Sequence, residues 1–194
     1  MKLLFLFFPF ILFSCTPQQV QTNPDQFKQL GQNILTPFKQ QLMGTLMSKL
    51  EESTLDAVEA CHTDAPNILE SVTNANQKVE VDGQIYRVSL GRSSHKLRNI
   101  QNESKEWMDD YIKSFQGKKD LNVEDHAKVK IVNDKSFAYL EPIVVGPMCI
   151  ACHGKDIDKD LLKVIDDKYP DDQARDFELG DFRGIFWVYF EQDK

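Results

Sequence analysis

The chain has 194 residues, of which 41% are hydrophobic, and a formal net charge of −7. This length suits one domain with a core of its own. Because the chain is acidic and has no cluster of basic residues interleaved with aromatic ones, we expect no nucleic acid among its partners.

The chain begins with an apolar segment. Residues 1–14 carry a single charge, Lys2, and the run stops at Cys15. It has the length of an export signal and is too short to span a bilayer. The end of the run resembles a bacterial lipobox, so we predict a signal peptide over residues 1–14 and lipidation of Cys15. An ordinary signal peptide that leaves Cys15 as a free thiol is the alternative.

A polar segment follows the predicted anchor. Residues 15–26 are rich in Pro and Gln and predict a tether ahead of one domain over residues 27–194. We expect a periplasmic or otherwise extracytoplasmic protein that a lipid holds at a membrane. Thr16 after the cysteine favours the outer membrane in a cell that has one. Without Lys2 the net charge is −8, which is compatible with a basic redox partner protein.

The hydrophobic pattern of the remaining chain predicts an α+β domain. We expect four or five antiparallel strands flanked by helices, with a long helix at the N-terminus. The predicted helices cover residues 36–60, starting at Thr36-Pro37, and residues 66–75, 107–115 and 159–168. The predicted strands cover residues 84–90, 126–132, 135–141 and 183–190, with a hairpin turn at Asn133-Asp134.

The most specific motif is Cys149-Ile150-Ala151-Cys152-His153. In C-x-x-C-H, two thiols can bond to the vinyl groups of one haem while the histidine binds its iron. The sequence therefore predicts a single, covalently bound haem c. Zinc would require a second pair of thiols, which the chain lacks. A thioredoxin-like pair belongs at the start of a helix after a parallel strand, whereas the expected context here is antiparallel.

Beyond this motif, the chain resembles a family of single-haem c-type cytochromes with a PAS-like fold. The same module serves as the sensory domain of some histidine kinases. The resemblance runs from about Leu55 to the C-terminus. Besides the haem motif with Gly154, it rests on Cys61 with Ala65-Pro66, Gly91-Arg92-Ser93, Arg98-Asn99, Asn102, Trp107, Tyr139 with Pro142-Ile143, Tyr169-Pro170, Ala174, Gly180-Asp181 and Arg183-Gly184.

The resemblance implies a particular pair of iron ligands. In this family the motif histidine and a cysteine thiolate bind the iron, and the matching residues are His153 and Cys61. Cys61 is also the one cysteine that neither lipid nor haem would use, and a leftover cysteine in an exported protein needs a role. A small buried hydrophobic residue is the other interpretation. His62 is the second candidate for the sixth ligand.

Other side chains are weaker candidates. Arg92 and Arg98 can pair with the haem propionates, since a guanidinium binds a carboxylate in bidentate fashion, or they can be ordinary surface arginines. We expect His95 and His126 to be solvated, and Trp107 and Met108 to lie in the core.

Two functions follow from these expectations. The first is one-electron transfer by a low-potential haem, without enzymatic catalysis. The alternative is a haem-based redox or gas sensor that binds NO or CO in its reduced state and acts through a separate partner.

Overall fold

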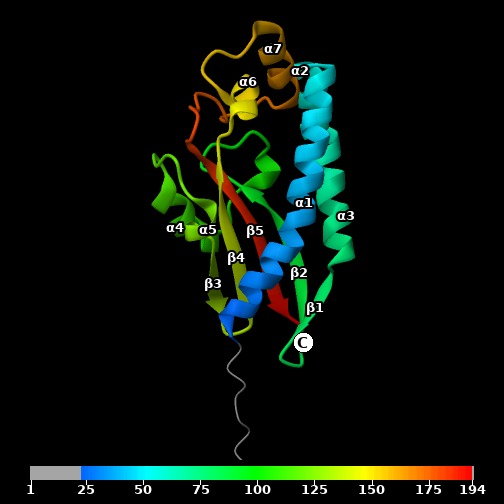
Figure 1. Cartoon of the computed structure of the whole chain (residues 1–194), viewed down its shortest axis with the longest axis vertical. Helices are drawn as coiled ribbons and strands as arrows, with labels where there is room; N and C mark the ends of the chain where they lie inside the picture. Colours follow the sequence, from blue (N-terminus) through cyan, green and yellow to red (C-terminus); the bar gives the residue numbers. More distant parts are fainter. Residues whose placement is uncertain (1–22, 194) are drawn as a thin grey trace, which may run out of the picture.

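The computed structural model describes residues 23–193 and has a five-stranded antiparallel sheet at its centre (Figure 1). The strand order is β1-β2-β5-β4-β3. The predicted α+β class is confirmed. Of the four or five strands expected, the sheet has five. The expected signal peptide, Cys15 and most of the tether lie outside the described residues. The strands are β1 Lys78–Val81, β2 Gln84–Ser93, β3 Lys128–Asn133, β4 Ser136–Val144 and β5 Phe182–Gln192.

Helices cover both faces and one end of this sheet (Figure 1). Over residues 23–193, no helix is both long enough and apolar enough to cross a membrane. The α-helices are α1 Pro24–Glu52, α2 Thr54–Glu59, α3 Ala65–Ala75, α4 Glu106–Phe115, α5 Val123–His126, α6 Ile150–His153 and α7 Lys159–Lys168. A π-helical turn, η1 Ala60–Asp64, joins α2 to α3, and two 3₁₀ turns are η2 Ile100–Asn102 and η3 Pro147–Cys149.

The long N-terminal helix is present, but the predicted start at Thr36-Pro37 is wrong. Helix α1 begins at Pro24, inside the expected tether, and the side chain of Asn23 caps it by accepting a hydrogen bond from the Asp25 backbone N–H at 3.0 Å. A proline inside a helix removes one backbone hydrogen bond. Packing outweighs that cost, because the buried face of α1 continues across the proline through Phe27, Ile34, Leu35 and Phe38.

Each face of the sheet has its own hydrophobic core. On one face, α1 and α3 pack against aromatic and aliphatic side chains of β2, β4 and β5. Contact is closest at Gly31 of α1, where a Cβ atom would lie 2.4 Å from Cβ of Tyr139. On the other face, α4 packs against Leu140 and Ile185 through the fully buried Met108. The predicted core position of Met108 is confirmed.

The short helices gather at one end of the sheet. Helices α2, α6 and α7 lie together where β4 ends and β5 begins (Figure 1). The predicted helix over residues 36–60 is interrupted there, since α1 ends at Glu52 and Ser53 caps α2 by accepting a hydrogen bond from the Asp56 N–H. This end of the molecule lies beyond both cores and carries the candidate site.

Candidate haem site

One cavity at this end of the sheet gathers the predicted site residues. Cys61, Arg92, Arg98, Cys149, Cys152 and His153 all line it, although they come from three stretches of the chain that lie far apart in sequence. Most of the other lining is apolar, and among the described residues no Asp or Glu contributes to it. The apolar contributors include Leu42, Met43, Leu46, Leu50, Ile143 and Phe186.

The C-x-x-C-H motif forms a compact turn. Pro147 begins η3, and α6 follows directly and contains Cys152 and His153. Gly154 then ends the helix by donating its N–H to the Ile150 carbonyl at 2.8 Å. A Cβ atom at Gly154 would lie 2.6 Å from that oxygen, so no larger residue fits here. This local geometry brings both cysteines and the histidine to one wall of the cavity.

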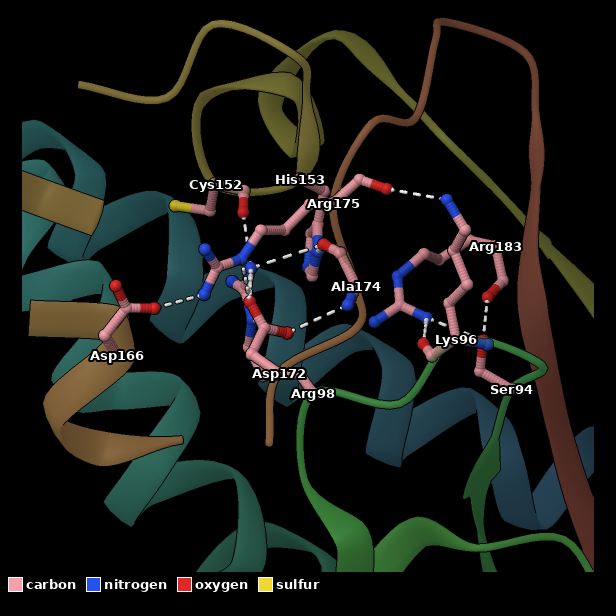
Figure 2. Close-up of polar contacts among 10 residues, drawn as sticks. All are labelled: Ser94, Lys96, Arg98, Cys152, His153, Asp166, Asp172, Ala174, Arg175 and Arg183. Atoms are coloured by element: carbon pink, nitrogen blue, oxygen red, sulfur yellow. Dashed lines mark hydrogen bonds and ion pairs between the residues drawn. The ribbon is translucent and has the colours of Figure 1, made fainter. Parts of the chain in front are cut away.

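His153 is held in one tautomer. Its Nδ1 lies 2.7 Å from the carbonyl oxygen of Ala174 (Figure 2). Since a carbonyl only accepts, Nδ1 carries the proton and Nε2 is left as a potential metal ligand. Burial, together with Arg183 and Arg98, holds the pKa of His153 well below its usual value. The ring is therefore the neutral imidazole that metal binding requires.

Arg98 anchors this turn to the segment that carries Ala174. Its Nη2 donates to the carbonyl of Cys152 at 2.6 Å and to that of Ala174 at 3.3 Å, and its guanidinium pairs with Asp172 at 3.2 Å (Figure 2). The Asp172 side chain is fully buried and also accepts from the Ala174 N–H at 2.9 Å. Arg98, suggested by the sequence as a propionate partner, thus already has a carboxylate of its own.

Asp172 is charged in this network. Burial alone would raise the pKa of its carboxyl group, but hydrogen bonds from Arg98 and Arg175 outweigh burial and lower the pKa below its ordinary value. Sequence reasoning missed Asp172 because its partners come from distant parts of the chain. Ala174 entered only through the resemblance, without a role. The contact between residue 174 and the haem motif is visible only in the fold.

Cys61 reaches the cavity from the π-helical turn η1. Its side chain is half-buried and lines the cavity, whereas the adjacent His62 is exposed and outside the lining. The His62 ring instead packs against the Tyr169 ring in a T-shaped arrangement, with ring centroids 5.2 Å apart. Single π-helical turns are rare and occur frequently at functional sites. Of the two candidates for a sixth ligand, the fold thus brings only Cys61 to the other site residues.

Two further side chains line the cavity without having been candidates. Tyr169 ends α7, and burial raises its pKa to about 12. Arg183 lies near the start of β5 and donates from Nη1 to Ser94 Oγ at 2.8 Å and to the Lys96 carbonyl at 3.0 Å (Figure 2). Burial, then Arg92 and Arg98, lower the pKa of Arg183 to about 9. Both residues belong to the motifs of the resemblance, which gave them no role.

The remaining sequence candidates lie outside the lining. His95 and His126 are half-buried, so the prediction that they are solvated is wrong. His95 stacks on Phe182 with ring centroids 5.7 Å apart. The centroids of the His126 and Phe115 rings are 5.1 Å apart. Trp107 packs in the α4 core.

The donor groups fit haem better than a redox-active cysteine pair. Burial raises the pKa of Cys152, whereas reactive C-x-x-C thiols have a lowered pKa. Over residues 23–193, no group of three or more His, Cys, Asp or Glu side chains could hold a metal ion by itself. An apolar cavity with two thiols, a neutral imidazole, a further thiol and arginines matches the needs of a macrocycle with carboxylate substituents.

Comparison with known proteins agrees with the fold. A family model described as Tll0287-like matches residues 19–190. The chain belongs to the Tll0287-like family. It is also similar to a solved crystal structure, that of the cyanobacterial heme-protein Tll0287, at 21% identity and a TM-score of 0.62 over 89% of this chain and 98% of that chain. At this identity the likeness establishes the Tll0287-like fold. No curated protein matches the chain in sequence.

Proposed function

We propose that the chain is an exported, lipid-anchored cytochrome that carries one haem c and transfers single electrons. The observation that carries this proposal is the convergence of Cys149, Cys152, His153 and Cys61 on one cavity. The description of a structural relative as a heme-protein supports the same cofactor. When bound, haem supplies an iron that exchanges one electron at a time.

In this proposal each site residue has a distinct task. Cys149 and Cys152 would hold the haem covalently, and His153 and Cys61 would bind its iron. The Ala174 carbonyl fixes the His153 tautomer and keeps Nε2 free for the iron. The apolar side chains of α1 that line the cavity would help to keep water away from the haem.

The charge of a cysteine thiolate determines the expected redox behaviour. Thiolate pushes electron density toward iron and favours the ferric state, whereas a methionine ligand raises the potential. We therefore expect a low-spin haem with a low midpoint potential. This ligand set suits a carrier rather than an enzyme, because two protein side chains, His153 and Cys61, would bind the iron and leave no position for a substrate.

Covalent haem attachment tests this function most directly. The full chain, produced in a host that attaches haem c, should retain haem after denaturing electrophoresis and give the absorption spectrum of a low-spin haem. The Cys149→Ala/Cys152→Ala double variant should lose the haem. An unmodified polypeptide in the wild type would contradict the proposal. Rapid, reversible CO binding to the reduced protein would instead favour the sensor function.

The lipid anchor is tested separately. The wild-type chain should sediment with membranes and carry a lipid at Cys15 by mass spectrometry, whereas Cys15→Ala should be released into the soluble extracytoplasmic fraction. A wild-type chain in that soluble fraction would remove the anchor from the proposal and leave the haem site untouched.

A further inference from the structure

The cavity has an excess of positive charge. Arg92, Arg98 and Arg183 line it, and among the residues described no acidic side chain does. Asp172 neutralises Arg98. Over residues 23–193, neither Arg92 nor Arg183 lies in a salt bridge with any carboxylate. Although the protein is acidic, two guanidinium groups without a carboxylate partner therefore line this one cavity.

Arg183 faces the cavity because of an irregularity in β5. The alternation of a strand would place it with Ile185 on the α4 face, opposite to Phe186, which lines the cavity. The pairing register of β4 and β5 shifts between Ile143 and Val144. Such irregularities redirect side chains and are common next to functional sites. The shift accounts for an arginine on the cavity side at this position.

The surrounding chain holds the Arg183 guanidinium in place. Nη1 donates to Ser94 Oγ and to the Lys96 carbonyl, and the group lies 5.1 Å from the centre of the Phe177 ring. At Gly184 a Cβ atom would lie 2.3 Å from the Ser93 carbonyl, so this close approach of β5 to β2 requires glycine. These contacts position the guanidinium without neutralising its charge.

Two positive charges that line a largely apolar cavity call for negative charges to balance them. A desolvated ion without a counter-ion is costly, and Arg92 and Arg183 also repel each other. Haem carries two propionate carboxylates, and guanidinium groups bind carboxylates with matched geometry. We propose that Arg183 and Arg92 bind the two propionates of the haem. Arg98 instead pairs with Asp172 and holds the haem motif in place. This inference rests on the proposed haem c function.

The test uses the full, haem-loaded chain. In Arg183→Gln, the propionate bending bands in the resonance Raman spectrum should shift, because those bands report hydrogen bonds to the propionates. Loss of a positive charge beside the haem should also favour the ferric state about tenfold, which lowers the midpoint potential by about 59 mV for a one-electron couple. Since the freed propionate would take up a proton more easily, the potential should depend more strongly on pH than in the wild type.

Two further variants keep the test decisive. Arg92→Gln removes no hydrogen bond within residues 23–193, so it should fold normally and shift the same Raman bands. Lys96→Gln is the matched control, because its ammonium group lies over the same Phe177 ring, donates to the Arg175 carbonyl and stays outside the cavity lining. Only the backbone carbonyl of Lys96 contacts Arg183, and the substitution leaves that group in place. It should leave the propionate bands unchanged.

The possible outcomes separate this inference from the proposed function. Unchanged propionate bands in both arginine variants, or an equal shift in Lys96→Gln, would overturn the arginine assignment while haem attachment stands. A wild-type chain without haem would overturn the proposed function itself. A shift of the bands in Arg98→Gln equal to that in Arg183→Gln would contradict the distinction between the two arginines.

Discussion

The Nδ1 atom of His153 lies 2.7 Å from the carbonyl oxygen of Ala174. Ala174 is held in turn by Asp172, which accepts its backbone N–H and pairs with Arg98. The histidine is thus oriented by a carboxylate with which it makes no direct hydrogen bond. Such supporting contacts determine how well a metal ligand is aligned.

Asp172→Asn should weaken this support. It leaves the Arg98 guanidinium without its carboxylate partner, so we expect a loss of about 2–3 kcal/mol in the free energy of unfolding, measured by urea denaturation. The electron paramagnetic resonance signal of the haem-loaded variant should broaden as the His153 ring becomes less well oriented. Asp166→Asn is the control, because Asp166 pairs with Arg175 at the surface and should contribute less than about 1 kcal/mol. Equal losses in the two variants would contradict the special role of Asp172.

Cys61→Ser should change the iron coordination. Without the thiolate, we expect loss of the wild-type low-spin electron paramagnetic resonance signal and a higher midpoint potential in a redox titration. His62→Gln should leave both unchanged, since His62 is exposed and outside the cavity lining. An unaltered signal in Cys61→Ser together with a changed signal in His62→Gln would reverse the ligand assignment.

Two glycines of α1 provide a matched test of the packing on the sheet. Gly31→Ala places a methyl group 2.4 Å from Tyr139 and should cost about 2 kcal/mol or more in the free energy of unfolding. At Gly44, by contrast, nothing lies within 4 Å of a Cβ atom. Gly44→Ala should therefore stabilise the helix by about 0.5–1 kcal/mol. Thermal unfolding followed by circular dichroism measures both effects, and a stabilising Gly31→Ala would show that α1 does not pack as described.

The stability of the domain should fall in acid partly through Asp172. Its pKa is below the ordinary value of 3.8 in the folded chain and close to that value in the unfolded chain. As the pH falls, the unfolded chain therefore takes up the proton first. The stabilisation that Asp172 contributes is complete above the pKa of the unfolded chain, and it is lost as the pH falls through the lowered pKa of the folded chain. Urea denaturation at several pH values should show a shallower acid decline in Asp172→Asn than in the wild type.

Glu178 offers a contrast at the surface. Hydrogen bonds from Lys119 and Lys155 lower its pKa to about 2, but the carboxylate is exposed. Its contribution should therefore be small and should disappear at high salt, whereas that of the buried Asp172 persists. An acid decline that salt removes entirely would contradict the role of Asp172.

Local patterns predicted much of the fold. The alternation around Asn133-Asp134 indicated a hairpin, which β3 and β4 form, and the apolar run before the C-terminus indicated β5. The strand β1 was missed because four residues with a single fully buried side chain, Val81, give no periodic signal. The start of α1 was missed because Pro37 and Thr36 carry the signals of a helix start, and tertiary packing overrides them.

The part of the site that could be predicted is the part in which the function depends on a fixed spacing of residues in the sequence. The C-x-x-C-H motif and a leftover cysteine identify four residues that the fold brings to one cavity. Spacing in the sequence could not show which arginines pair with a carboxylate of the protein and which remain available to a ligand. Whether an arginine meets a carboxylate depends on distant partners, as for Arg98 and Asp172, and the orientation of Arg183 depends on a register shift in the sheet. Gly184, directly after Arg183, is the one local signal of that irregularity.

The turn η1 sets the rotational phase between two stretches of one continuous helical segment. Each residue advances an α-helix by about 100°, so removing one residue from this turn would rotate α3 by that angle relative to α2. Val72 would then leave the core that it shares with α1, or Cys61 would leave the cavity. The wider turn thus allows one segment to serve a core and a cavity that lie in different directions. We expect sequence length between Val58 and Val72 to be far less tolerant of change than side-chain identity at its exposed positions.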